Sequence, residues 1–261
     1  SDDFGMPLVD LISFHFYPQH KVDALGNFSS SGTTVRTSSS SNESIRETRM
    51  DFPRSLWDST YIEPSWLTNA KLSGESNMIL HRLQNSINQY FPGVKIMIGE
   101  FDFGHDTDVT HGLSTIDYLG AGSQYGISIS NRWDLNPYNG PTYTNTAYQL
   151  FRNYDGNSTT YGSKAVYSNF DAKADGSVWA SLNDDETQLH IIIINKDIND
   201  SLNFNINTEE TGFEYAITAV YAVNASNTNI SLLEAAEVNI SGSTITGALP
   251  ELSAYHLVIN R

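Results

Sequence analysis

Val94-Lys-Ile-Met-Ile-Gly-Glu100 is a short apolar run that ends in a carboxylate, and helical patterns flank it on both sides. Before it, apolar residues recur at helical spacing from Ile79 to Tyr90, with Ser76 as a candidate N-cap. After it, a second helix is predicted from about Thr110 to Gly122. The run therefore predicts a buried strand between two helices, as in an α/β fold.

Two further strands extend this pattern in both directions along the chain. Val9-Asp-Leu-Ile-Ser-Phe-His-Phe-Tyr17 is apolar on both faces and predicts a buried parallel strand. Ile127–Asn131 predicts a third strand, and residues 144–153 a third helix. Because strands and helices alternate, we expect a parallel sheet wrapped by helices.

The pattern changes after Gly156, where short β-branched and aromatic runs are separated by Asn, Asp and Gly clusters. This spacing is typical of an all-β sandwich. We therefore predict an α/β region over residues 1–155 and a β-sandwich domain over residues 156–261. The sandwich strands are expected at Ser177–Leu182, Gln188–Asn195, Leu202–Ile206, Tyr215–Val223 and Tyr255–Ile259.

Two stretches between the predicted elements lack clean periodicity. Residues 27–42 are rich in Ser, Gly and Thr, and we expect a flexible surface loop there. Residues 54–66 are aromatic, and we expect an ordered loop.

Composition excludes several classes of function. The 261 residues include 14 Lys and Arg against 30 Asp and Glu, a formal charge of −16 that repels phosphate backbones and anionic lipids. We therefore expect no nucleic-acid partner and no membrane partner. The absence of cysteine excludes disulfides, thiolate nucleophiles and Cys-ligated metals.

The predicted strands present polar side chains where they end, and reactive groups in βα barrels occupy that position. Glu100 ends one strand, and His15 and Tyr17 lie on one face at the end of another. A tyrosine hydroxyl there could donate to a carboxylate and keep it ionised. A strand-end carboxylate can equally cap a helix or pair with Arg132, and His15 can be a rim histidine with no chemical role, so spacing alone leaves both readings open.

Aromatic residues are candidates for stacking on sugar rings. Loop tryptophans also often hold loops in place, and this alternative stays open for each residue. The candidates are Trp57, Tyr61, Trp66, Trp133 and Tyr138.

A polar cluster, His105, Asp106, Asp108 and His111, is close enough in sequence to bind a metal. We favour a solvated polar loop and expect no metal at the site and no cofactor. Whether a structural calcium is bound stays open.

Four blocks resemble successive blocks of glycoside hydrolase family 44. The resemblance runs from about residue 4 to the C-terminus, except in the Ser-rich stretch, and the Arg-Ser-Leu-Trp-Asp sequence is its most specific part. The blocks are Phe14-His-Phe-Tyr-Pro, Arg54-Ser-Leu-Trp-Asp-Ser-Thr-Tyr-Ile-Glu-Pro-Ser-Trp66, Ile98-Gly-Glu-Phe-Asp-Phe-Gly104 and Gly112-Leu-Ser-Thr-Ile-Asp-Tyr-Leu-Gly120.

This resemblance implies a secreted endo-β-1,4-glucanase or xyloglucanase, built as a (β/α)8 TIM barrel followed by a β-sandwich. The chain would supply barrel strands 6 to 8 and the sandwich, with the N-terminal half of the barrel as its missing partner. Glu100 would be the nucleophile of a retaining reaction on β-glucan, at the end of the seventh strand. The residues implied to bind substrate are His15, Tyr17, Trp57, Tyr61, Trp66, Asp102 and Trp133.

The acid/base carboxylate that this reaction needs is not found in the sequence. Asn42-Glu43 is the only Asn-Glu dipeptide, but it lies in the Ser-rich stretch with no apolar strand before it, and we do not expect Glu43 to be the acid. Eight βα units of about 30 residues make a barrel, and only three strands precede Gly156. A non-catalytic carbohydrate-binding or scaffold fragment, and a barrel hydrolase acting on xylan, remain as alternatives.

Overall fold

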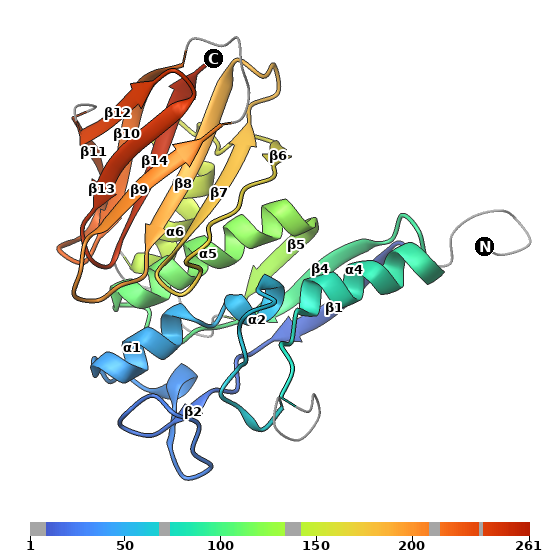
Figure 1. The fold of residues 1–261 in the computed structure, drawn as a ribbon. Coiled ribbons are helices and arrows are strands. Elements are labelled where there is room, and N and C mark those ends of the chain that lie inside the picture. Colours follow the sequence, from blue (N-terminus) through green and yellow to red (C-terminus); the bar gives the residue numbers. More distant parts are fainter. Residues whose placement is uncertain (1–8, 68–73, 134–141, 209–214, 235–236) are drawn as a thin grey trace, which may run out of the picture.

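The computed structural model of the chain describes residues 9–67, 74–133, 142–208, 215–234 and 237–261 (Figure 1). The N-terminal region holds a three-stranded parallel sheet in the order β1-β4-β5. Its strands are β1 (Leu11–Phe16), β4 (Lys95–Phe101) and β5 (Ile127–Arg132). The predicted strands are present and parallel. Because Ser13 and His15 are exposed, however, β1 is not buried on both faces as its sequence predicted.

Helices and a short hairpin complete this region. Among the described residues, no helix is long and apolar enough to cross a membrane. The elements are β2 (Lys21–Val22), β3 (Thr33–Thr34), the 3-10 helix η1 (Val35–Thr37), α1 (Glu43–Met50), α2 (Arg54–Trp57), α4 (Ile79–Tyr90), α5 (Val109–Tyr125) and α6 (Tyr143–Arg152).

Helix α5 is the central helix, buried along most of its length. It begins where the Asp108 side chain accepts a hydrogen bond from the Thr110 amide, and it ends at Gly126, whose φ of 78° favours glycine. It packs against α1 and α6 and also against the sheet that follows in the chain. Figure 1 shows it between the parallel sheet and that second sheet.

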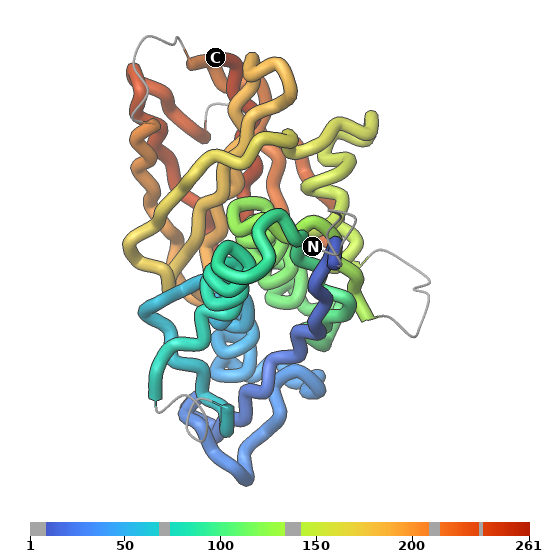
Figure 2. The backbone as a smooth tube through the Cα atoms, turned by 90° about the vertical axis from the view of Figure 1, so that its right-hand side faces the viewer, coloured from blue at the N-terminus to red at the C-terminus, as the bar shows by residue number. Residues whose placement is uncertain are grey.

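The C-terminal region is a sandwich of two antiparallel sheets, seen at the top of Figures 1 and 2. A six-stranded sheet has the order β11-β10-β14-β8-β7-β6, and a three-stranded sheet has the order β12-β13-β9. Apolar side chains such as Ile191, Phe204 and Leu257 fill the space between them. The strands are β6 (Lys164–Val166), β7 (Gly176–Leu182), β8 (Gln188–Asn195), β9 (Leu202–Asn207), β10 (Ala216–Asn224), β11 (Asn227–Leu233), β12 (Val238–Ser241), β13 (Thr244–Leu249) and β14 (Ser253–Asn260).

The two regions share a hydrophobic core. Ile192 and Ile194 of β8 project to the other face of the large sheet and join the cluster that contains Leu113 of α5. A Cβ atom on Gly120 would lie 2.2 Å from the Trp179 ring, so only glycine lets α5 approach β7 this closely. An α/β region followed by an all-β region is thus observed, while the boundary after residue 155 stays a prediction.

Three sequence-based expectations about local structure were wrong. The Ser-rich stretch is not a loose loop throughout, because Val35 is fully buried and its amide donates to the His20 carbonyl. Residues 54–57 are helical rather than an ordered loop. Ser76 does not cap the next helix, since α4 begins after Met78, which has a left-handed backbone.

Candidate active site

The carboxyl ends of β1 and β4 bring His15 and Glu100 side by side. His15 pairs with Glu100 in the parallel register, and the register shifts by one residue just before this pair, at Gly99. A Cβ atom on Gly99 would lie 2.8 Å from the Ser13 hydroxyl and 3.3 Å from the His15 ring. Glycine at this position therefore allows the two strand ends to approach.

Glu100 is held by the two residues at the end of β1 that the sequence singled out, His15 in the strand and Tyr17 just after it. The Tyr17 hydroxyl donates to Glu100 Oε2 at 2.7 Å, and His15 Nδ1 lies 3.2 Å from the same oxygen. The Glu100 side chain is 29% exposed, so it is fixed in place and still reachable. Burial, together with the hydrogen bond to Glu100, raises the pKa of Tyr17 to about 12, which keeps its hydroxyl a donor at neutral pH.

Asp102 lies beside this pair between two guanidinium groups. Asp102 Oδ2 is 3.7 Å from Arg36 Nη1, and Asp102 Oδ1 is 3.9 Å from Arg132 Nη2. Arg36 also lies over the Tyr17 ring, 5.1 Å from its centroid. Sequence reasoning missed Arg36, because it lies in the Ser-rich stretch. The sequence signal that this part of the stretch is ordered is the neighbouring Val35, an apolar residue that packs into the core.

The polar loop after β4 forms a network in which Arg132 has a central place. Arg132 hydrogen-bonds Asp106 and also lies near Asp102. The sequence left open an ion pair between Arg132 and Glu100, but Arg132 pairs with these two aspartates instead. His111 is fully buried, its Nδ1 bonds the Gly104 carbonyl at 2.6 Å, and burial lowers its pKa to about 4. His111 is therefore neutral at neutral pH and donates through Nδ1.

Metal-ligating atoms in this loop come together in a different set from the one the sequence offered. Asp102, Asp106 and His111 have ligand atoms within 4.8 Å of one another. Asp108 is instead committed to Arg46, whose Nη2 lies 2.8 Å away, and to capping α5. Since the Arg132 guanidinium already supplies positive charge at Asp106, the arrangement suits an ion-pair network.

Trp57 and Tyr61 do not offer faces to a glycan near Glu100, contrary to the prediction. Trp57 is only 8% exposed, and its ring meets Trp179 edge to face at 5.2 Å. Tyr61 is equally buried, with its hydroxyl bonded to His20 and the Arg54 guanidinium over its ring. Both serve packing, because a stacking platform needs an exposed ring face.

The Arg-Ser-Leu-Trp-Asp block is structural as well. Arg54 donates to Asp58 and to Asp51, each at 2.8 Å, and the Ser55 hydroxyl donates to Glu63. These bonds fix the turn after α2 and account for the block's residue types.

Trp66 and Trp133 remain available as sugar platforms. They are 50% and 43% exposed, respectively, and Tyr138 lies outside the described residues. The Trp133 amide donates to the Phe101 carbonyl at 2.8 Å, which ties its backbone to the residue that follows Glu100. Glu43 lies elsewhere, at the start of α1, and accepts a hydrogen bond from Asn199 of the sandwich region. It is thus committed to a structural contact.

The chain is similar to known proteins over nearly its whole length, although no protein-family model matches it. Endoglucanase A of Paenibacillus lautus is 34% identical over 258 residues, which are 98% of this chain and 35% of that protein. A solved family 44 endoglucanase of Clostridium acetobutylium matches with a TM-score of 0.88 and 32% identity over 100% of this chain. The resemblance to glycoside hydrolase family 44 is confirmed.

A solved Paenibacillus polymyxa xyloglucanase of family 44, in complex with xyloglucan, matches 97% of the chain with a TM-score of 0.82 and 28% identity. The chain spans 48% and 47% of the lengths of these two family 44 structures and about a third of the curated relative. The strand ends that carry His15, Tyr17 and Glu100 thus belong to a chain that resembles glucan hydrolases throughout.

Proposed function

We propose that this chain carries the nucleophile of a retaining glycoside hydrolase that cleaves β-1,4-glucan. The observation that carries the proposal is the Tyr17–Glu100 hydrogen bond at the carboxyl end of a parallel sheet. It gives a partly exposed carboxylate a fixed direction, and a nucleophile that attacks an anomeric carbon needs both access and a fixed direction.

In the proposed reaction, a Glu100 oxygen attacks the anomeric carbon while the bond to the leaving-group oxygen breaks. A second carboxylic acid protonates that oxygen, and the same group, as carboxylate, then takes a proton from the water that releases the sugar. This acid lies about 5 Å from the nucleophile in retaining enzymes. We infer that it comes from a part of the barrel outside this chain, because the dipeptide candidate Glu43 bonds Asn199 of the sandwich region.

We further propose that β1, β4 and β5 are strands 6 to 8 of a TIM barrel, with residues 1–155 as the partial barrel and 156–261 as the sandwich domain. Half-buried Leu11, Ile12 and Phe14 on β1, and 45%-exposed Ile129 on β5, support this, since a closed barrel would cover them. The N-terminal half of the barrel is the proposed partner.

The proposed substrate is a β-1,4-linked glucan chain such as cellulose, xyloglucan or mixed-linkage glucan, and secretion is proposed because such polymers lie outside cells. His15, Tyr17 and Asp102 would contact the sugar at the cleavage point, and Trp66 and Trp133 would stack on neighbouring rings. Measuring hydrolysis of xylan beside that of β-glucan distinguishes this proposal from the alternative of a barrel hydrolase that cleaves xylan.

A mechanism-based inactivator tests the nucleophile in this chain. A 2,4-dinitrophenyl 2-deoxy-2-fluoro-β-cellobioside needs no acid for departure of its leaving group, so attack by Glu100 would leave a stable glycosyl ester. Mass spectrometry of proteolytic fragments should find the adduct on Glu100. The Glu100→Gln variant should stay unlabelled, and Glu75→Gln, which alters an exposed carboxylate on another surface, should be labelled like the parent chain. Labelling at another residue would remove Glu100 from this role.

A further inference from the structure

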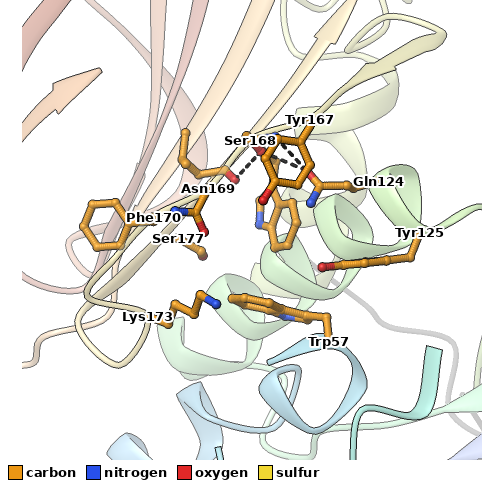
Figure 3. Close-up of a pocket in the computed structure, with 11 residues that line it drawn as sticks. Trp57, Gln124, Tyr125, Tyr167, Ser168, Asn169, Phe170, Lys173 and Ser177 are labelled. Atoms are coloured by element: carbon orange, nitrogen blue, oxygen red, sulfur yellow. Dashed lines mark hydrogen bonds between the residues drawn. The ribbon is translucent and has the colours of Figure 1, made fainter. Parts of the chain in front are cut away.

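A second group of aromatic and polar side chains surrounds a hollow at the opposite end of the parallel sheet (Figure 3). Trp57 comes from α2, Gln124 and Tyr125 from the last turn of α5, and Tyr167 from the segment between β6 and β7. Since α5 ends just before β5 begins, this hollow lies toward the amino ends of the strands, whereas Glu100 lies at a carboxyl end.

The walls present unused aromatic surface and an unused donor. Tyr167 is 80% exposed, so a face of its ring is open to a ligand. The Trp57 indole N–H is buried and has no hydrogen-bond partner among the described residues. Figure 3 shows the Tyr125 hydroxyl and the Lys173 ammonium directed toward the space between these rings.

The hollow is held in shape by a side-chain amide. Gln124 Oε1 accepts from both the amide and the hydroxyl of Ser168, each at 3.0 Å. One amide therefore ties the end of α5 to the segment that carries Tyr167, so the walls are fixed before a ligand arrives.

The charge at the hollow is nearly balanced. Lys173 Nζ lies 5.6 Å from the centre of the Trp57 ring and 3.8 Å from the buried Asp58 carboxylate. Because Asp58 offsets the ammonium charge, the site offers hydrogen-bond donors without a strong preference for anions.

We propose that the hollow formed by Trp57, Tyr125, Tyr167 and Lys173 is a second carbohydrate-binding site, for a neutral oligosaccharide. The hollow measures about 60 Å³, so it accepts a small polar group such as a hydroxymethyl group but not a whole sugar ring. The ring itself stacks on the exposed face of Tyr167. Such a site holds a glycan away from Glu100 and requires no hydrolysis, so it stands or falls separately from the proposed function.

Fluorine NMR of the chain labelled with 5-fluorotryptophan tests the site directly, because the chain has only four tryptophans. Titration with cellotetraose should shift the Trp57 signal, and Tyr167→Ala should weaken this binding about tenfold. Tyr90→Ala removes another exposed ring, 65% exposed, from α4 and should leave cellotetraose binding unchanged. Tyr17→Phe alters the Glu100 site and should also leave the Trp57 response unchanged.

The proposal is overturned if cellotetraose leaves the Trp57 signal unmoved, or if Tyr167→Ala and Tyr90→Ala behave alike. Tighter binding of tetragalacturonate than of cellotetraose would also overturn it, since Lys173 would then act as an anion site. A shift of Trp133 alone would place the glycan at the Glu100 end, which supports the proposed function and removes this second site.

Discussion

Glu100 is held in place by side chains from the neighbouring strand end. Tyr17 and His15 both reach its Oε2 atom, and Asp102 lies between Arg36 and Arg132 two residues further along. A carboxylate that only capped a helix would bond backbone amides. Glu100 instead accepts a phenol hydroxyl and stays 29% exposed, which is the arrangement of a group that meets a ligand.

We predict that Glu100→Gln nearly abolishes turnover in a protein that carries this chain together with the rest of the barrel. Glutamine keeps the shape and removes the nucleophile, so turnover should fall by several orders of magnitude while ground-state glycan binding is largely kept. A reducing-sugar assay on cellulose and xyloglucan measures the loss. Substantial residual activity that added azide does not change would count against Glu100.

A second prediction contrasts two tryptophans. Trp133→Ala should weaken oligosaccharide binding by about 1 to 3 kcal/mol and change the melting temperature little, because the residue is 43% exposed. Trp57→Ala should instead lower the free energy of unfolding by about 3 to 5 kcal/mol, since the ring is packed against Trp179. Calorimetric titration and urea unfolding separate the two effects. Equal loss of stability in both variants would make Trp133 a packing residue.

At the scale of elements, the junction between α5 and β7 depends on a buried ion pair. Lys196 Nζ lies 2.8 Å from Asp117 Oδ2, and Asp117 Oδ1 accepts from Ser177 and from the Trp179 indole. Both charged groups are buried, so each relies on the other to offset the loss of hydration.

Asp117→Asn should therefore destabilise the chain by about 3 to 5 kcal/mol, because it leaves the Lys196 charge buried and unpaired. Urea unfolding measures the change. Glu186→Gln breaks the exposed pair with Lys164, which solvent screens, and should leave the free energy of unfolding nearly unchanged. A similar small cost for both variants would show that Lys196 finds another partner.

Strands β8 and β14 carry a buried histidine pair that should make stability sensitive to acid. His190 Nδ1 lies 3.1 Å from His256 Nε2, and Tyr154 and Tyr161 pack around them. Burial lowers the pKa of His190 to about 4 and that of His256 well below 6.5. The folded state therefore holds both rings neutral, while the unfolded chain binds protons below about pH 6.5.

This stability is complete above about pH 6.5 and is lost as the pH falls toward 4. Between pH 7.5 and pH 4.5 the parent chain should lose about 2 kcal/mol more than a His190→Gln variant. Urea unfolding at the two pH values provides the comparison, and it cancels the contribution of carboxylates common to both. Parallel pH profiles would contradict neutral burial of His190.

For the whole molecule, we predict that this chain alone does not hydrolyse glycosidic bonds. A nucleophile without a general acid loses the acid's contribution of about 10²- to 10⁴-fold, and an incomplete barrel lacks half of its cleft. The open edges at β1 and β5 should also make the chain self-associate as its concentration rises. A reducing-sugar assay with sedimentation analysis, repeated after adding the proposed N-terminal half, measures both. Robust activity from a verified monomer of this chain would contradict the incomplete-barrel proposal.

Much of the fold was predictable because it depends on local patterns of apolar and polar residues. The apolar run 94–100, the helical spacing after Ile79 and the strands β7, β8, β10 and β14 of the large sheet all depend on which neighbours along the chain are apolar. Glu100, His15 and Tyr17 were found for the same reason, since a strand end is marked by where the apolar alternation stops. β11, β12 and β13 were not predicted, because Asn, Ser and Thr occupy much of them and weaken the alternation.

The sequence by itself determined the three parallel strands of the first region, the longer helices between them and the residues at the strand ends. Only the tertiary structure decided which side chains meet there, because Arg36 reaches Tyr17 and Asp102 from a stretch whose composition is that of a loop. It likewise decided that Trp57 is buried against Trp179 while Trp133 is exposed, since a ring's exposure depends on residues distant in sequence. Contacts between segments far apart in the chain leave no periodic signal in either segment.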